Sequence, residues 1–269
     1  MVNKNFIKTV KDFYSHNSRP MPWRETTDPY KIFLSEVMLQ QTQVDRVIPK
    51  FQEFIARFPT ISDLAQADFK DVLAYWAGLG YNRRALWLHQ AAKDIVDKHQ
   101  GLIPHTVEEL SALKGVGHNT ASAICAYAFN MPVFYIETNI RAVFIHHFFE
   151  DRDDVSDAEL YPLVQSHVDN KNPRQWYWAL MDYGVYIKKL YKNPARKSKH
   201  HSKQSKFEGS NRQLRGNILK LLLKKSSFTY IGMADELSID VEKIEDVFQT
   251  LMKEGLIVQD ARTSRYSLA

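Results

Sequence analysis

Cysteine and long apolar runs are what this sequence lacks most clearly. One cysteine, Cys125, stands among 269 residues, which excludes a disulfide, a thiolate zinc cage and an iron–sulfur cluster held by cysteines. No run of about 18 apolar residues is present, and the first residues lack the apolar core of a secretory signal, so we expect a cytoplasmic protein with no membrane partner. The histidine pairs at 146–147 and 200–201 have no carboxylate or cysteine at ligand spacing, and we predict no metal site.

The composition favours a globular protein with an anionic partner. Hydrophobic residues make up 44% and aromatic residues 12%, which is enough for true cores. The net charge is +5, and the positive residues are unevenly placed along the chain. Nucleic acid is therefore the first candidate for a partner.

Apolar residues recur at helical spacing over most of the chain. The pattern runs from Phe6 to about Lys188 and predicts an all-α domain over residues 1–187. Residues 188–206 then contain eight Lys or Arg and no acidic residue. We interpret residues 188–209 as a basic linker, which either binds phosphates or is disordered.

The last part of the chain, residues 210–269, has a different pattern. Three helical stretches, at 214–223, 233–237 and 241–253, precede two short apolar runs around a polar turn. This order is typical of a small winged helix-turn-helix domain. Such modules bind DNA, although many only mediate protein contacts.

Two glycines lie one residue apart in the stretch 113–121. Gly115 and Gly117 allow a turn with positive φ, after which backbone amides and a helix N-terminus can face a phosphate. A hairpin of this kind grips the DNA backbone without reading its sequence. An ordinary turn between helices is the alternative.

The residues of this stretch, Leu-Lys-Gly-Val-Gly-His-Asn-Thr-Ala, resemble the hairpin of the helix-hairpin-helix DNA glycosylase superfamily. Further motifs are similar to its adenine glycosylase (MutY-type) branch, in the same order, so that the likeness covers about residues 6–187. These motifs lie at 22–24, 28–30, 35–44, 48–49, 58–60, 76–81 and 179–184. The resemblance implies an all-α glycosylase domain, here followed by the winged helix domain.

Glu36 is the predicted general acid. Cleavage of an N-glycosidic bond needs a protonated acid for the base and a carboxylate near the sugar cation. Glu36 lies among apolar residues, where desolvation raises a carboxyl pKa. The resemblance assigns it to protonation of the adenine ring and activation of water. A surface glutamate on an amphipathic helix is the alternative.

Glu137 is the predicted partner of this acid, although the superfamily has an aspartate there. An extra methylene can move a carboxylate by about 1 Å, which can cost on the order of a hundredfold in rate. The alternative for Glu137 is an interaction with the dipole of the following helix. Asn139 matches a residue that orients the carboxylate, and its alternative role is helix capping.

Asn119 occupies the position at which bifunctional relatives carry a Schiff-base lysine. An amide cannot form that imine, and Lys114 is too remote in the pattern to replace it. We therefore predict a monofunctional glycosylase without lyase activity.

The resemblance also assigns residues to DNA contact. Gln41 and Tyr81 match side chains that insert into the duplex when a base is extruded, and Arg83 and Arg84 would suit phosphates, with solvated or helix-closing roles as alternatives. The remaining assigned residues are Gln40, Lys114, Gly115, Val116, Gly117, His118, Asn119 and Thr120.

The base pocket matches the resemblance less well. Arg19 and Trp23 lie where the branch builds its adenine pocket, whereas Trp178 replaces a glutamine or glutamate that contacts the base edge. An indole has one donor and no acceptor, which weakens the preference for adenine.

Two larger features of the branch are missing. The four cysteines of its iron–sulfur cluster are absent, and a winged helix stands where a domain that checks for 8-oxoguanine is usual. We expect no cofactor, although a monovalent cation at the hairpin is compatible with the pattern.

The expected function is excision of mispaired adenine opposite guanine or 8-oxoguanine, by a monomer acting on double-stranded DNA with a mismatch or lesion. One alternative is a glycosylase for mismatched thymine, uracil or another modified base. A second alternative is a non-catalytic protein that binds distorted duplexes.

Overall fold

The computed structural model describes residues 2–202 and 206–269, which divide into two compact units. Unit 1 combines residues 1–36 with 103–203, and unit 2 combines residues 37–102 with 204–269. No described helix is both long and apolar enough to span a bilayer. The predicted all-α class is confirmed, since the described residues are mainly helical and their two strands form a short hairpin near the C-terminus.

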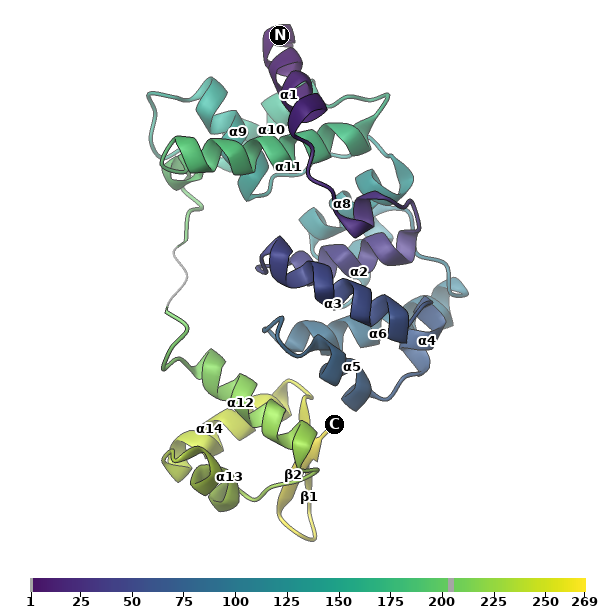
Figure 1. Ribbon diagram of the computed structural model, residues 1–269, viewed down its shortest axis with the longest axis vertical. Helices are drawn as coiled ribbons and strands as arrows, with labels where there is room; N and C mark the ends of the chain where they lie inside the picture. The colour runs from purple at the N-terminus through teal and green to yellow at the C-terminus, as the bar shows by residue number, and fades with distance from the viewer. Residues whose placement is uncertain (1, 203–205) are drawn as a thin grey trace. The chain divides into compact units, whose positions relative to one another are not determined.

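Unit 1 is built around two helices that pack against each other, α9 (Thr138–Phe148) and α11 (Pro173–Leu190) (Figure 1). Gly184 on α11 permits this approach, because a Cβ there would lie 2.6 Å from the carbonyl oxygen of Asn139. The other elements are α1 (Lys4–Asn17), η1 (Pro22–Arg24), most of α2 (Pro29–Leu39), α7 (Val107–Ala112), α8 (His118–Phe129), α10 (Asp157–His167) and η2 (Pro194–Lys197).

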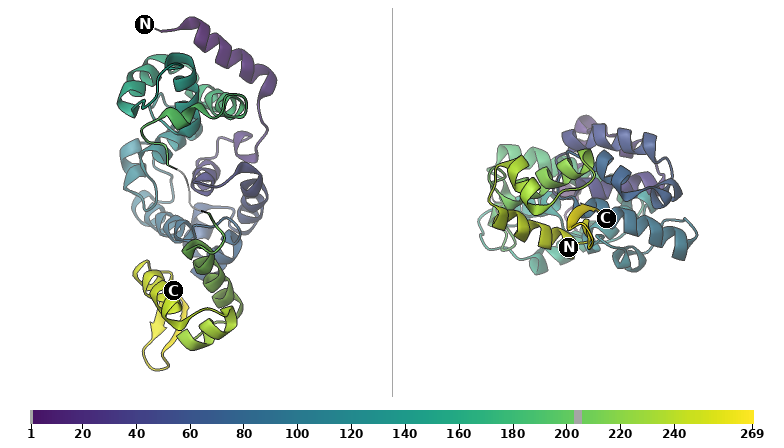
Figure 2. Two further views of the ribbon diagram at one scale, coloured as in Figure 1. Left: turned by 90° about the vertical axis from the view of Figure 1, so that its left-hand side faces the viewer. Right: turned by 90° about the horizontal axis from the view of Figure 1, so that it is seen from below.

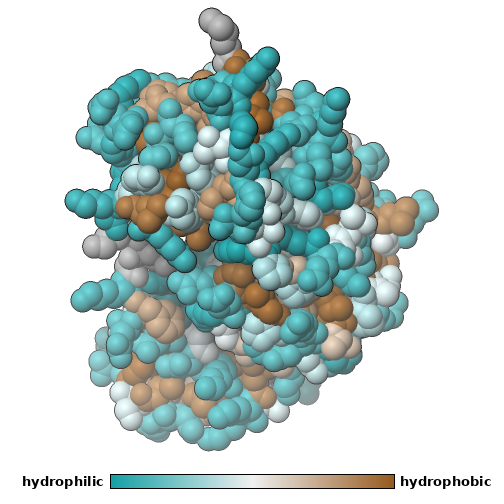
Figure 3. All heavy atoms as spheres, turned by 45° about the horizontal axis from the view of Figure 1, so that its top comes forward, coloured by the Kyte–Doolittle hydropathy of each residue, from teal (hydrophilic) through white to brown (hydrophobic). Residues whose placement is uncertain are grey.

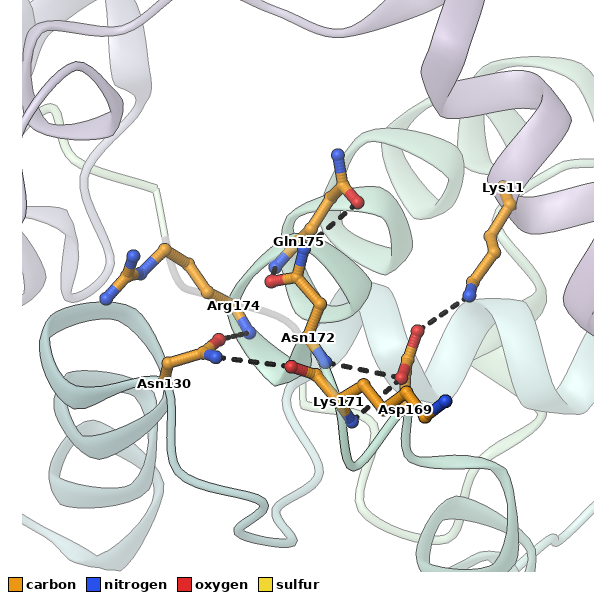
Figure 4. Close-up of polar contacts among 7 residues, drawn as sticks. All are labelled: Lys11, Asn130, Asp169, Lys171, Asn172, Arg174 and Gln175. Carbon is orange, nitrogen blue, oxygen red and sulfur yellow. Dashed lines mark hydrogen bonds and ion pairs between the residues drawn. The ribbon is translucent and has the colours of Figure 1, made fainter.

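A polar network fixes the start of α11 (Figure 4). Asn172 is the N-cap and accepts a hydrogen bond from the amide of Gln175, while Asp169 accepts from the amide of Asn172. Asp169 also pairs with Lys11 of α1 at 2.6 Å, and Asn130 accepts from the amide of Arg174 at 3.1 Å. The helix that carries Trp178 and Asp182 therefore begins at a defined place.

The first part of unit 2 is a set of four helices that continues from the end of α2. Its connections are short and capped; at Thr60, for example, a capping box with Asp63 starts α4. Helix α6 packs against α4 and α5. The bounds are α3 (Val44–Arg57), α4 (Ile61–Gln66), α5 (Phe69–Trp76) and α6 (Arg83–His99).

The second part of unit 2 has the element order expected of a winged helix. Helices α12 (Asn211–Lys224), α13 (Tyr230–Leu237) and α14 (Val241–Lys253) precede the antiparallel strands β1 (Ile257–Asp260) and β2 (Arg265–Leu268) (Figures 1 and 2). Phe228 forms an isolated antiparallel bridge to Tyr266 on β2. The ring of Tyr266 packs against Tyr230 and Phe248, so helices and sheet share one core.

The linker after α11 is shorter than the basic composition of residues 188–209 predicts. Helix α11 continues to Leu190, and η2 follows with Pro194 and Ala195 buried. The amide of Val155 then donates to the carbonyl of Lys197, and the amide of Lys199 donates to the carbonyl of Val155, each at 3.0 Å. The predicted boundary at 187 is therefore wrong, because the packed chain of unit 1 extends to Lys199.

Candidate active site

Glu36 lies in the last turns of α2, among the buried side chains of Leu34, Val37 and Met38. Desolvation raises the pKa of its carboxyl to about 8, and the negative charge of Glu137 adds to this effect. Arg24 acts in the opposite direction and is the smallest of the three influences. The protonated form expected of a general acid is therefore the dominant form at neutral pH.

Glu137 is the N-cap of α9. Its Oε1 atom accepts hydrogen bonds from the amides of Asn139 and Ile140, the latter at 2.9 Å, and its Oε2 atom accepts from Asn139 Nδ2 at 3.1 Å. Burial raises the pKa of this carboxyl, whereas the backbone hydrogen bonds and the charge of Lys188 lower it. Glu137 therefore lies at the start of α9, as its alternative role beside the dipole of the following helix requires, and these contacts also fix its carboxylate, whose charge acts on Glu36.

The two carboxyl groups have different surroundings. Both carboxyl groups are desolvated, but Glu36 lies beside a like charge, whereas Glu137 accepts three hydrogen bonds that suit an ionised carboxylate. Such a difference assigns the proton to Glu36 and the charge to Glu137. Lys188 faces this charge, and we missed it in the sequence because it opens a run of basic residues.

Arg19 is tied to a buried carboxylate. Its Nε atom donates to Asp182 Oδ1 at 2.6 Å, and Arg24 donates to both oxygens of Asp182 at 2.7 and 3.1 Å. Asp182 therefore joins two arginines from the N-terminal segment to α11. The predicted pocket residue Arg19 has its Nε committed to this network.

Trp23 is buried, and Trp178 lies in an aromatic cluster. The Trp178 ring stacks on Tyr127 at 5.9 Å, with the guanidinium of Arg24 5.5 Å from its centroid. The hydroxyl of Tyr127 accepts a hydrogen bond from Tyr135, and burial followed by the charge of Glu36 raises the Tyr127 pKa. Tyr127 thus belongs to the surroundings of the acid, although nothing in its sequence context distinguished it from a core residue.

The hairpin contains the turn expected from its glycines, with one difference. Gly115 has a φ of 77°, in the left-handed region, whereas Gly117 has a φ of −87° and serves as the N-cap of α8. Val116 is buried, so only its backbone can face a ligand. Lys114, His118 and Asn119 are exposed, and Thr120 is partly exposed.

Asn119 connects α8 to the segment before Glu137, because its Nδ2 atom donates to the carbonyl of Ile136 at 2.8 Å. The hairpin is therefore joined by a hydrogen bond to the residue that precedes Glu137. This contact gives Asn119 a structural role at the position where bifunctional relatives carry a Schiff-base lysine.

The residues predicted to insert into DNA lie on strained turns of unit 2. Gln41 has a φ of 54° and is exposed, and Tyr81 has a φ of 48° with 38% of its surface exposed. Gln40, which precedes Gln41 in the sequence, is partly buried. Left-handed backbone at two residues other than glycine is typical of functional turns.

Arg84 does not have the exposed position predicted for it. Its guanidinium is buried and donates to the carbonyls of Val37, Met38, Leu79 and Gly80 and to the hydroxyl of Thr42. A phosphate contact is therefore the wrong role for Arg84, which instead satisfies the carbonyls at the end of α2. The neighbouring Arg83 is exposed, with its guanidinium over the ring of Trp87 at 4.4 Å.

Within the described ranges, no group of three or more His, Cys, Asp or Glu side chains is placed to hold a metal ion.

Residues 34–162 match the model described as "HhH-GPD superfamily base excision DNA repair protein". We call these residues, after the model that they match, the HhH-GPD segment. It contains Glu36, the hairpin and Glu137, so the family match and the geometry of the carboxyl groups concern the same residues.

The HhH-GPD segment lies within a longer match to curated adenine DNA glycosylases. The protein of that name from Buchnera aphidicola subsp. Baizongia pistaciae is 34% identical over 184 residues, which cover 68% of this chain and 52% of the relative. The one from Homo sapiens is 33% identical over 194 residues, covering 68% of this chain and 36% of the relative. The chain thus spans about half or less of the length of these relatives.

Solved structures share the fold of the HhH-GPD segment. A thermostable thymine-DNA glycosylase aligns with a TM-score of 0.62 and 25% identity, covering 68% of this chain and 85% of that one. The endonuclease III of a non-covalent complex with DNA aligns with a TM-score of 0.59 and 19% identity, over 69% of this chain and 87% of that one. At this identity, the likeness concerns the fold alone.

Proposed function

We propose that this protein is a monofunctional DNA glycosylase that removes mispaired adenine from double-stranded DNA. The observation that carries the proposal is the pair formed by Glu36, with a pKa of about 8, and Glu137, fixed at the start of α9. The likeness to adenine DNA glycosylases over 68% of the chain supports the choice of base.

In the proposed reaction, protonated Glu36 donates its proton to the adenine ring and so makes the base a better leaving group. The carboxylate of Glu137 stabilises the cationic sugar as the bond to the base breaks. Glu36, now ionised, then accepts a proton from the attacking water. The products are free adenine and an abasic site, with the DNA strand intact.

DNA binding in this proposal begins at the hairpin. The turn at Gly115 and the N-terminus of α8 suit a phosphate, and the exposed Lys114 adds positive charge. Gln41 and Tyr81 fill the space left by the extruded base. The basic residues between Lys188 and Lys199 add phosphate contacts. This part of the predicted linker is packed against Val155 and is therefore ordered.

A second substrate, mismatched thymine, is favoured by one specific feature. Trp178 presents an aromatic face and no acceptor where an adenine edge would be read, and a thymine-DNA glycosylase is similar in structure at 25% identity. Stacking on Trp178 would accommodate either base.

The test uses labelled duplexes with A:8-oxoG, A:G, T:G or U:G pairs, followed by alkali. The proposal expects alkali-dependent cleavage of the adenine strands by the full chain and none by Glu36→Gln. Cleavage confined to thymine or uracil strands would establish the second substrate instead. Binding of all four duplexes without cleavage would refute a glycosylase, and cleavage before alkali would refute the monofunctional mechanism.

A further inference from the structure

The third helix of the winged helix is unsuited to DNA. In helix-turn-helix modules that read DNA, the recognition helix enters the major groove. Here that helix is α14, whose exposed residues include Glu242, Glu245 and Asp246. Their spacing of three and four residues places them on one face, where the exposed Lys253 also lies, so this face carries a net negative charge and is poorly suited to phosphates.

The first helix of the same module has the opposite character. Arg212, Gly216, Lys220 and Lys224 recur every four residues along α12 and form one stripe, which we call the α12 stripe. The helix contains no acidic residue, and its buried side chains lie on the other face. Lys220 and Lys224 form no ion pair with any residue in the described ranges.

Gly216 is the unexpected residue of the α12 stripe. Glycine inside a helix is unfavourable by about 1 kcal/mol relative to alanine. Nothing within the protein requires it, because a Cβ built at Gly216 meets no atom within 4 Å. A missing side chain in the middle of a basic stripe instead lets an outside partner approach the helix backbone closely.

One end of the α12 stripe lies beside the predicted inserting residue. Arg212 donates from Nη1 to the hydroxyl of Tyr81 at 2.9 Å, and its guanidinium lies 5.8 Å from the Tyr81 ring centroid. Both residues belong to unit 2. A duplex that receives Tyr81 would therefore pass the start of α12.

We infer that the winged helix binds the phosphate backbone of duplex DNA through the α12 stripe, with Gly216 at the point of closest approach and α14 turned away from the DNA. The inference rests on the proposed function, which makes duplex DNA the substrate. It assigns the module a contact that is independent of base sequence. On the face drawn in Figure 3, hydrophilic side chains lie between the apolar patches.

The test measures the affinity of the full chain for an undamaged labelled duplex at several salt concentrations. The double variant K220E/K224E should weaken binding. It should also make the negative slope of log K against log salt shallower by about 1.8, since each phosphate contact contributes about 0.9 to its magnitude. The control K243E/K253E makes the same change in charge on α14, and it should leave the slope unchanged. A third variant, Gly216→Gln, keeps every charge and should weaken binding without loss of folding.

Three results would overturn the inference: an unchanged slope for K220E/K224E, equal losses for both double variants, or full affinity for Gly216→Gln. The first is also what a purely protein-binding module would give. Base release is measured separately on the same proteins. If the parent protein releases no base but K220E/K224E changes the salt slope of DNA binding, the proposed function alone is refuted. If the parent protein releases base but K220E/K224E leaves the slope unchanged, the inference alone is refuted.

Discussion

Replacement of Glu36 by glutamine should abolish base release and stabilise the protein at the same time. Glutamine has nearly the shape of glutamate but cannot transfer a proton, so the chemical step is lost. It also cannot ionise, so the variant avoids the cost of a charge in desolvated surroundings. A residue that lowers stability but is needed for activity is typical of a functional site.

The size of the effect follows from the pKa of about 8, against 4.5 for an ordinary glutamate. Between these values the folded chain holds a proton that the unfolded chain releases, so stability falls as pH rises through this window. One pKa unit corresponds to about 1.4 kcal/mol. The advantage of Glu36→Gln in the free energy of unfolding should therefore grow by about 2.5 kcal/mol from pH 5 to 7, and by about 4 kcal/mol from pH 5 to 9.

Urea unfolding of both proteins at pH 5, 7 and 9 measures this difference, and single-turnover base release across the same range measures the acid. The rate for the parent chain should fall about tenfold per pH unit above pH 8 as Glu36 loses its proton. A stability difference that does not change with pH would refute the reasoning, because it would mean that Glu36 ionises alike in the folded and unfolded chains. Asp45→Asn, on the exposed start of α3, is the control for the loss of one carboxylate outside the site.

Three further predictions concern residues around this site. Glu137→Gln removes the charge that raises the pKa of Glu36, so a carbon-13 titration of Glu36 should move to lower pH; an unchanged or raised pKa would contradict the coupling. Gly184→Ala places a Cβ 2.6 Å from the carbonyl oxygen of Asn139 and should lower the free energy of unfolding by about 1–3 kcal/mol. Urea unfolding measures this loss, and an unchanged urea midpoint would contradict the prediction. Arg84→Met leaves several carbonyls unpaired and should cost about 3 kcal/mol while the salt slope of DNA binding stays constant; a reduced slope would restore the phosphate role.

The parts of the fold that repeat a pattern could be predicted from the sequence. Helical periodicity identified the all-α architecture, and the apolar neighbours of Glu36 indicated the desolvation that raises its pKa. The turn at Gly115 followed from its backbone freedom alone. Each of these inferences depends on residues that are close together in the chain.

The parts that depend on distant contacts could not be predicted in this way. Arg84 follows Arg83 and has the sequence context of a basic surface, yet the carbonyls that bind it come from the end of α2. The basic composition after Lys188 likewise concealed the pairing with Val155, which joins segments more than 40 residues apart. Charge indicates that a side chain needs partners, but not whether those partners are water, phosphate or the protein's own backbone.

Asp182 makes the acidity of the site adjustable from a distance. Its carboxylate accepts hydrogen bonds from Arg19 and Arg24, and the charge of Arg24 lowers the pKa of Glu36. Asp182 therefore acts on the pH at which Glu36 holds its proton through the position of Arg24. In the proposed glycosylase, substitutions at this one carboxylate could retune the working pH and leave Glu36 and Glu137 as they are.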